Sequence, residues 1–460
     1  MSAEQVEAAV AKMREAGQSE ASIRQFSFAM ERVLSGAETM IPSSELEPAP
    51  DVPLLESLPS VDAASVLERL AVVKLNGGLA TSMGLQQPKS LLEARDGRSF
   101  LEIVVGQTLA LRRRYGARLP LILMNSESTR EPTTAALARF SDLATPGLPA
   151  DFLQSMVPKL DAESMLPARW PAATALEWCP PGHGDVYASL VGSGVLEALK
   201  DQGFRYVMIS NSDNLGATVD PLIAGHIAHE QIPFLMEVVL GTAADRKGGH
   251  IARRLSDGQL VLRETAQTPE EDAESFRDYQ RWRYYNTNSL WIDLDAIGAR
   301  FAGDGRLELP VIVNRKTVDP RDSSSTPVLQ LESAMGAAIG SFPGAGLLQV
   351  PRTRFVPVKT TDDLLLLRSD VFRLVDEFRV EPATADGAQP LVALDKEFFG
   401  MIDDFEARIP AGPPSLREAQ KLVVKGDVRF GAGVVVRGEV EIDAPADGMR
   451  VEDDAVLGDD

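Results

Sequence analysis

The chain has only one cysteine, Cys179, and four histidines among its 460 residues. A single cysteine excludes an intrachain disulfide and a zinc site built from several cysteines. Four histidines are too few for a His-rich metal centre. Two of them, His226 and His229, lie three positions apart in an expected helix. No third ligand is evident for that pair, so an ordinary solvated helix face is favoured over a metal site.

Long apolar runs are also missing from the sequence. No stretch reaches the roughly 20 apolar residues that span a bilayer, and no N-terminal segment joins a basic start to an apolar core. We therefore expect a cytoplasmic protein without a membrane partner. Positive charge is scarce, because 46 Lys and Arg face 67 Asp and Glu and give a net charge of -21. This balance argues against a general nucleic-acid binder, although a local basic pocket remains possible.

Residues 1–64 are expected to form a helical N-terminal extension and a linker. Apolar and charged positions follow helical spacing over the first forty residues, as in "EQVEAAVAKMREAG" and "ASIRQFSFAMERVL". Prolines then recur between Pro42 and Pro59. Proline lacks a backbone donor and fixes φ, so this stretch predicts an extended connector without regular structure.

Residues 65–384 are expected to form an α/β domain. Short apolar runs such as "AVVKL" (71–75) and "YVMIS" (206–210) alternate with longer amphipathic stretches. That alternation is typical of a mostly parallel sheet covered by helices. Asp257 and Gly258 separate two strand-like runs and predict a β-hairpin there.

Residues 385–460 are expected to form a second, smaller domain with an acidic tail. Between Leu422 and Ile442, β-prone runs recur between glycines about every six residues. This repeat favours a few coils of a β-helix, with a simple hairpin as the alternative. The domain boundary is placed in the polar, helix-poor stretch 380–390.

The segment "VVKLNGGLATSMGLQQPKSLLE" (72–93) predicts an anion-binding loop at the end of a buried strand. It matches neither the P-loop nor the GxGxxG pattern. Gly77 and Gly78 nevertheless allow a close approach of backbone N–H groups to an anion or a base edge, and Lys89 adds a positive charge. A glycine-rich turn with a surface lysine is the alternative.

Asp213 ends another apolar run, "FRYVMISNSDN". A carboxylate at that place suits Mg²⁺, which prefers one or two carboxylates together with waters and substrate oxygens. An Asx-turn or a helix cap that ends the strand is the alternative.

These motifs resemble those of a known family. "LNGGLATSMG" followed by "PKS" is similar to the nucleotide-binding loop of eukaryotic-type UDP-glucose pyrophosphorylases, also called UTP–glucose-1-phosphate uridylyltransferases; Ala80 departs from the family's usual Leu-Gly-Thr run. Further matching blocks occur in the same order and bring the resemblance to most of the span 71–363. They are "PPGHGD" (180–185), "SNSDNLGATVD" (210–220), "FLMEV" with "KGG" (234–249), "YNTNSLW" (285–291), "LQLESAMGAAIGSF" (329–342) and "VPRTRFVPVKTTDDL" (350–364).

The resemblance implies a three-layer, Rossmann-like nucleotidyltransferase domain, with the helical extension before it and a left-handed β-helix after it. It also implies a reaction. A phosphate oxygen of glucose 1-phosphate attacks the α-phosphorus of UTP with the help of Mg²⁺, and UDP-glucose and pyrophosphate form. Because both reactants are anions, the protein has to position them and neutralise their charge.

The resemblance further assigns residue roles. Lys89 and Lys359 are the catalytic lysines at the phosphates, Asp213 is the metal ligand, and Gln154 faces the imide edge of uracil. The implied nucleotide-binding residues are Leu75, Asn76, Gly77, Gly78, Lys89, Gln154, Gly182, Asn211, Ser212, Asp213 and Lys359. The implied sugar-binding residues are His183, Asn211, Gly249, Glu264 and Asn288. A turn-capping role is the alternative for His183.

Two other functions stay open from the sequence. One is a UDP-sugar pyrophosphorylase of broad sugar range, and the other is a nucleotide-sugar binder without catalysis, which the retained Lys89, Asp213 and Lys359 disfavour. The acidic end of the chain would repel a second copy in an end-to-end contact. We therefore expect a monomer or a homodimer.

Overall fold

The computed structural model describes residues 2–36, 39–79, 81–384 and 387–458, so Ala80 lies outside the described residues. Its centre is a sheet of ten described strands. Six strands (β17, β11, β10, β2, β5 and β6) run in one direction, and β14 runs against them between β11 and β10. The expected α/β class with a mostly parallel central sheet is confirmed. The ten strands are β1 (Leu46–Pro48), β2 (Leu70–Asn76), β5 (Leu121–Asn125), β6 (Asp151–Leu153), β10 (Tyr206–Asn211), β11 (Phe234–Leu240), β12 (His250–Arg254), β13 (Leu260–Arg263), β14 (Tyr284–Asp293) and β17 (Gly346–Gln349).

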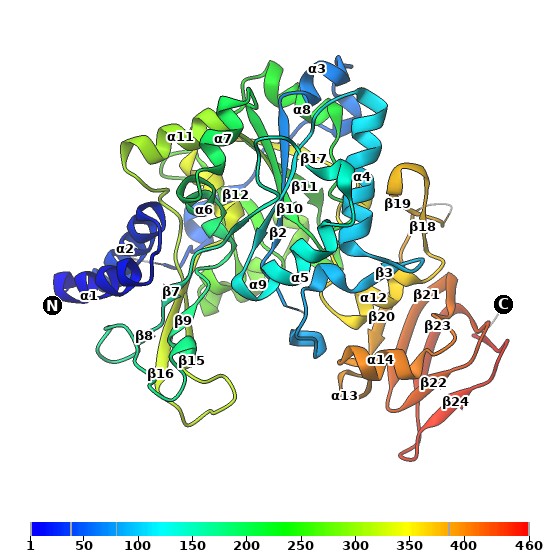
Figure 1. Cartoon of the computed structure of the whole chain (residues 1–460). Coiled ribbons are helices and arrows are strands. Elements are labelled where there is room, and N and C mark those ends of the chain that lie inside the picture. The colour runs from blue at the N-terminus through cyan, green and yellow to red at the C-terminus, as the bar shows by residue number, and fades with distance from the viewer. Residues whose placement is uncertain (1, 37–38, 80, 385–386, 459–460) are drawn as a thin grey trace.

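Helices cover both faces of this sheet (Figure 1). In β2, Leu70 and Val72 enter one hydrophobic core, whereas Ala71 and Val73 enter the other. Burial on both faces explains why the strand is an unbroken apolar run apart from one lysine. The helices that pack on the first face include α4 (Phe100–Tyr115) and α8 (Pro221–His229), and those on the second are α6 (Val186–Gly192), α7 (Val195–Asp201) and α11 (Leu294–Gly303).

The predicted hairpin is present, because β12 pairs with β13 in antiparallel register and Gly258 between them has a φ of 72°. The connector prediction was wrong in part. Within it, β1 pairs with β12 at the edge of the sheet. Pro48 is tolerated there because an edge strand needs no ladder donor on its open side.

The N-terminal amphipathic stretches are helices α1 (Ser2–Glu15) and α2 (Glu20–Leu34). They pack on a three-stranded antiparallel sheet made of β15 (Ile312–Thr317), β16 (Pro327–Glu332) and β8 (Leu160–Asp161). Lys12 fixes this packing by an ion pair of 2.5 Å with Glu177.

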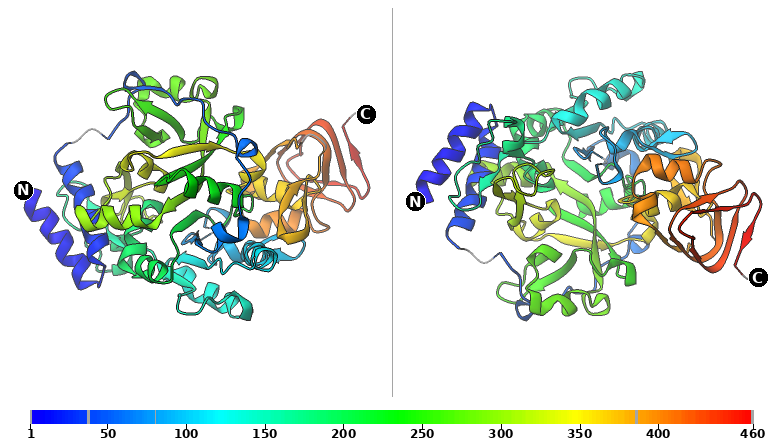
Figure 2. Two further views of the ribbon diagram at one scale, coloured as in Figure 1. Left: turned by 90° about the horizontal axis from the view of Figure 1, so that it is seen from above. Right: turned by 90° about the horizontal axis from the view of Figure 1, so that it is seen from below.

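The C-terminal region is built from parallel strands. They form one sheet of β20 (Leu391–Leu394), β21 (Ser415–Lys425), β23 (Val435–Asp443) and β25 (Val456–Leu457), and a second of β22 (Val428–Phe430) and β24 (Met449–Val451). Since β21 and β23 pair in parallel, the hairpin alternative for this segment is wrong. Both views in Figure 2 place this region and the N-terminal helices at opposite ends of the molecule.

The remaining elements connect these parts. They are α3 (Ala63–Leu67), β3 (Glu93–Arg95), β4 (Arg98–Ser99), α5 (Glu127–Leu137), β7 (Val157–Pro158), β9 (Trp178–Cys179), α9 (Ala273–Phe276), α10 (Tyr279–Trp282), α12 (Thr361–Arg368), β18 (Phe372–Leu374), β19 (Val380–Pro382), α13 (Lys396–Phe399) and α14 (Ile402–Arg408).

Candidate active site

Four neighbouring parallel strands, β10, β2, β5 and β6, all end on the same side of the sheet. We call this side, where their carboxyl ends lie, the carboxyl edge, and the opposite side the amino edge. In register, Leu75 lies beside Asn211, Asn76 beside Asn125, and Asn125 beside Leu153. Ligands of α/β proteins bind at this edge. The glycine loop after β2, Gln154 after β6 and Asp213 after β10 therefore share one region, as the sequence predicted for the loop.

Two predicted nucleotide-binding side chains hold this edge together. The Asn76 amide donates to Asn125 Oδ1 (2.7 Å) and to Thr133 Oγ1 (3.0 Å). Ser212 donates its hydroxyl to Asn76 Oδ1 (3.3 Å) and its backbone N–H to Leu75 O (3.1 Å). Asn76 and Ser212 thus fix the loops that follow β2 and β10 relative to each other.

Gln154 lies directly against the glycine loop. A Cβ atom on Gly77 would come within 2.4 Å of Gln154 Oε1, so any larger residue at position 77 would push the Gln154 side chain aside. The backbone N–H of Gln154 donates to Asn125 O (2.7 Å). Its amide group has no hydrogen-bond partner among the described residues, which leaves donors and an acceptor for a ligand.

Lys89 and Asp213 form an ion pair across this edge. Lys89 Nζ lies 2.8 Å from Asp213 Oδ2 and also donates to Val358 O. The side chains of Lys89 and Asp213 are only 17% and 19% exposed. The pair joins two segments that lie 124 residues apart in the sequence.

The second oxygen of Asp213, Oδ1, is buried without a hydrogen-bond partner. Within the described part of the chain, no cluster of three or more His, Cys, Asp or Glu side chains forms a closed metal site. One carboxylate with an unpaired oxygen fits Mg²⁺, which takes its other ligands from substrate phosphates and water. The donor set therefore fits the predicted hard cation.

Lys359 ends an irregular segment, 350–359, that lies along the Asp213 loop. Val356 N donates to Asn214 Oδ1 (2.9 Å), and Val358 N donates to Asp213 O (3.3 Å). Lys359 N then donates to Asp363 Oδ2 (2.7 Å) at the start of α12. The Lys359 side chain is exposed, and its ammonium group has no partner among the described residues.

His183 and Glu264 lie within the electrostatic influence of Lys359. Desolvation lowers the pKa of His183 to about 4, and the Lys359 charge adds to this effect. His183 Nδ1 accepts a hydrogen bond from Met335 N (3.0 Å), so the neutral ring carries its proton on Nε2 and can donate it to a ligand. Desolvation raises the pKa of Glu264, while Lys359 opposes the rise.

The other predicted sugar-binding residues have distinctive backbone positions. A Cβ on Gly249 would lie 2.6 Å from Glu264 Oε1, so the two residues are in contact. Asn288 has a φ of 55° and receives a hydrogen bond of 2.9 Å from the Asn286 amide on its Oδ1. Asn211 is half-buried at the end of β10. Gly182, expected at the nucleotide, has a φ of 80° and packs on Ser333.

Sequence analysis missed two buried cations beneath the Asp213 loop. Lys74 is 2% exposed and donates to Ser210 Oγ and Ala217 O, each at 2.7 Å. Burial lowers its pKa to about 7. Arg354 donates to both carboxylate oxygens of Glu237, each at 2.7 Å. Lys74 interrupts the apolar run of β2, and this interruption could have predicted a buried, hydrogen-bonded cation.

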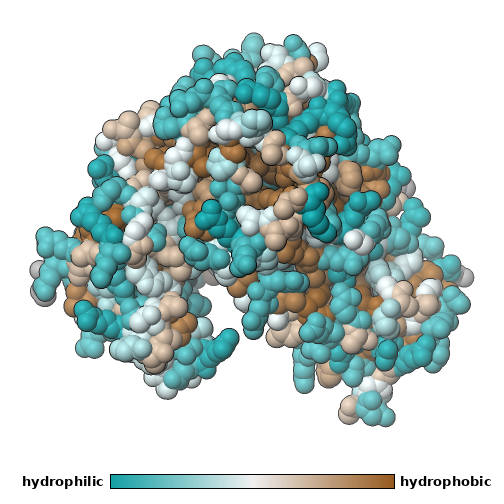
Figure 3. All heavy atoms as spheres, viewed as in Figure 1, coloured by the Kyte–Doolittle hydropathy of each residue, from teal (hydrophilic) through white to brown (hydrophobic). Residues whose placement is uncertain are grey.

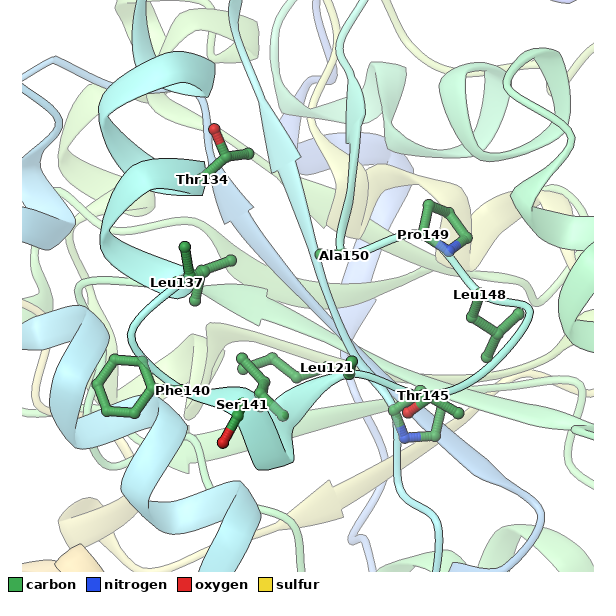
Figure 4. Close-up of a pocket in the computed structure, with 13 residues that line it drawn as sticks. Leu121, Thr134, Leu137, Phe140, Ser141, Thr145, Leu148, Pro149 and Ala150 are labelled. Carbon is green, nitrogen blue, oxygen red and sulfur yellow. The ribbon is translucent and has the colours of Figure 1, made fainter.

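The molecular surface is hollowed in two places. Figure 3 shows a notch between the lobe of β8, β15 and β16 and the lobe of the C-terminal strands. A separate apolar pocket of about 330 Å³ lies at the amino end of β5 (Figure 4). Leu121, Leu137 and Phe140 contribute to its wall, far along the strands from the Lys89–Asp213 pair.

No helix in the described part of the chain is long and apolar enough to cross a membrane.

The chain is similar to several proteins of known sequence or structure. The family model described as UTP–glucose-1-phosphate uridylyltransferase matches residues 23–437. The enzyme of that name from Hordeum vulgare is 41% identical over 428 residues, which cover 91% of this chain and 85% of the relative. The one from Saccharomyces cerevisiae is 42% identical over 390 residues, covering 84% and 76%. A mutant UDP-glucose pyrophosphorylase from Leishmania major, solved with UDP-glucose, superposes with a TM-score of 0.92 at 41% identity and covers 98% and 97% of the two chains.

Proposed function

Because this chain belongs to the UTP–glucose-1-phosphate uridylyltransferase family, we propose that it makes UDP-glucose and pyrophosphate from UTP and glucose 1-phosphate. The observation that carries the proposal is the meeting of Lys89, Asp213 and the Lys359 segment at one edge of the sheet. These groups come from three distant parts of the chain and place positive charge where two anionic substrates have to meet.

The glycine loop and Gln154 hold the nucleotide. The free amide of Gln154 offers a donor and an acceptor to the imide edge of uracil, while Gly77 and Gly78 let the backbone approach the base. Leu75 and Gly182 border the same space. Asn76 and Ser212 act through the loop conformation that their hydrogen bonds fix.

Lys89 and Asp213 serve the triphosphate. Lys89 and Asp213 neutralise each other in this structure, so a phosphate that pairs with Lys89 would free the Asp213 carboxylate. Asp213 would hold Mg²⁺, which would supply charge neutralisation at the phosphates of UTP. Two unit charges 4 Å apart interact by about 4 kcal/mol at an effective dielectric constant of 20. The net gain on binding is the difference between the Lys89–phosphate interaction and the Lys89–Asp213 interaction that it replaces.

Lys359 holds the attacking phosphate against the α-phosphorus. Its ammonium group is exposed and unpaired among the described residues, so no protein contact has to be broken before it binds phosphate. A phosphate oxygen of glucose 1-phosphate forms the new P–O bond, and pyrophosphate leaves with the electrons of the broken one. Lys359 stabilises the charge that this transition state shares between both groups.

The glucose ring would lie along His183, Asn211, Gly249, Glu264 and Asn288. His183 Nε2–H donates to a hydroxyl oxygen, whereas the Glu264 carboxylate accepts from a hydroxyl group. Gly249 has no side chain to displace the Glu264 carboxylate that lies against it. This arrangement favours a sugar with hydroxyl groups on several carbons over a substrate without a sugar.

The test is pyrophosphate release from UTP and glucose 1-phosphate with and without MgCl₂, followed in both directions. Release that requires the metal supports the proposal. UDP-glucose binding without turnover would overturn it in favour of a nucleotide-sugar binder. Equal rates with galactose 1-phosphate and xylose 1-phosphate would replace it with a pyrophosphorylase of broad sugar range.

The remaining proposals concern organisation. We assign 1–64, 65–384 and 385–460 to the extension with its linker, the three-layer catalytic domain and a left-handed β-helix; the parallel C-terminal strands support the last assignment. We also propose a cytoplasmic monomer or homodimer, with light scattering as the test of its mass.

A further inference from the structure

A buried network of hydroxyl groups and one carboxylate lies directly behind Gln154. Asp185, the last residue of "PPGHGD", is 3% exposed. Its Oδ2 accepts from Ser155 N (2.6 Å) and from Ser189 Oγ (2.5 Å). Ser155 is the chain neighbour of Gln154, so the carboxylate holds the backbone on which Gln154 is carried.

The same network reaches the N-terminal helix. Ser155 Oγ lies 2.5 Å from Ser22 Oγ in α2 and 3.1 Å from Ser189 Oγ in α6. Gln18, just before α2, accepts from Met156 N at 3.0 Å. Residues 155 and 156 are therefore fixed by groups that lie more than 130 positions away in the sequence.

Asp185 also ends the turn that contains Gly182 and His183. Its backbone N–H donates to Gly182 O (3.2 Å), while Gly184 N donates to Ser333 O (2.8 Å). Burial raises the pKa of Asp185, and the hydrogen bonds from Ser189 and Ser155 oppose that rise. Asp185 thus joins two segments predicted at the nucleotide, since its side chain holds residue 155 beside Gln154 and its backbone N–H holds Gly182.

We propose that Asp185 is a positioning residue that fixes the Gln154 amide and thereby sets the preference of the enzyme for uracil over cytosine. The inference rests on the proposed uridylyl transfer. The imide edge of uracil offers acceptor, donor, acceptor, whereas cytosine offers acceptor, acceptor, donor. An amide that turns by 180° exchanges its donor for its acceptor and could serve either base. The Gln154 amide lies beside Gly77, so a displacement of residues 154 and 155 would change the direction in which the amide meets the base.

The experiment compares kcat/KM for UTP and for CTP in the full-length wild type, Asp185→Ala and Asp185→Asn. We expect Asp185→Ala to lower the UTP:CTP ratio about tenfold, because small displacements of a positioning group weaken an oriented contact. Most of this change should lie in KM, since Lys359 and the phosphates are untouched. Asp185→Asn keeps one oxygen that can accept both hydrogen bonds, so the ratio should return to within about twofold of wild type.

A matched control is Asp293→Ala at the amino edge of the sheet. Asp293 is also buried, at 9% exposed, and accepts from Asp295 N (2.8 Å) and Arg205 Nε (3.0 Å). Its loss should lower the melting temperature without changing the UTP:CTP ratio. If Asp185→Ala does not fold, Ser189→Ala takes its place, with an expected drop in the ratio of about threefold from the loss of one donor.

An unchanged ratio in a folded, active Asp185→Ala enzyme overturns the inference, as does an unchanged ratio in Ser189→Ala when the first variant does not fold. An equal drop in the Asp293→Ala control overturns it as well, because general loosening would then explain the effect. Wild type that turns over neither nucleotide defeats the proposed function instead, so the two failures are distinguishable.

Discussion

The two edges of the central sheet carry opposite kinds of surface. At the carboxyl ends of the strands, Lys89, Asp213 and Lys359 bring charge together from distant segments. At the amino end of β5, a pocket of about 330 Å³ has walls formed largely by leucine, proline and alanine side chains (Figure 4). Loops that follow parallel strands can be varied for binding while the other edge serves packing. The comparison predicts that substitutions at the first edge change catalysis and those at the second change stability.

Lys359→Ala should have the largest effect on the first edge. Its unpaired ammonium group is expected to act mainly in the transition state, so kcat should fall about a thousandfold, or about 4 kcal/mol. The melting temperature should stay unchanged, because the side chain is exposed and contacts no described partner. Steady-state kinetics measure the loss, and Lys359→Arg is the control that keeps the charge. Wild-type turnover in Lys359→Ala would remove this residue from the active site.

Asp213→Ala should lower kcat about a hundredfold through weaker binding of the metal. Excess MgCl₂ should restore part of the activity in this variant and none in Lys359→Ala, because the proposed cation ligand is Asp213 and not Lys359. Titration of activity against MgCl₂ checks this difference. The same magnesium dependence in wild type and Asp213→Ala would contradict the metal assignment.

Leu137→Ala tests the opposite edge. Leu137 is 7% exposed and lines the apolar pocket, so its truncation should cost about 2 kcal/mol in the free energy of unfolding. That cost is at the low end for a buried leucine because the adjoining pocket already lacks packing. Denaturant unfolding gives the value, while kcat and KM should remain those of wild type. A clear loss of kcat would mean that the two edges are coupled.

The sequence predicted the positions of local features better than the contacts between them. The glycine loop, the place of Asp213 at a strand end and the hairpin at Gly258 can each be predicted from a single segment, because each depends only on residues close together in the sequence. The Lys89–Asp213 ion pair and the Asp185 network depend on segments more than a hundred residues apart or on a helix at the N-terminus. The strand β1 was missed because the prolines around it predict irregular structure. An edge strand tolerates proline, since one side of it forms no ladder hydrogen bonds.

Two histidines near the carboxyl edge, His183 and His250, are expected to have different roles, one in binding and the other in stability. His183 accepts a hydrogen bond on Nδ1 at the site, whereas His250 is 0% exposed and stacks 4.7 Å from the Trp282 ring. Desolvation lowers the pKa of His250 to about 3 from its ordinary value of 6.5. The unfolded chain therefore binds a proton more readily than the folded one. The resulting stability is complete above pH 6.5 and is lost as the pH falls from there towards 3.

His250→Phe should remove this acid sensitivity while keeping the stacked ring. Between pH 6 and pH 5, wild type should lose roughly 1 kcal/mol more free energy of unfolding than the variant, since one proton linked to unfolding contributes about 1.4 kcal/mol per pH unit. Urea unfolding at both pH values gives the difference. Parallel losses in the two proteins would show that folding does not lower the pKa of His250. His183→Phe, by contrast, should raise the KM for glucose 1-phosphate, because its proposed role is to donate a hydrogen bond from Nε2 to the sugar.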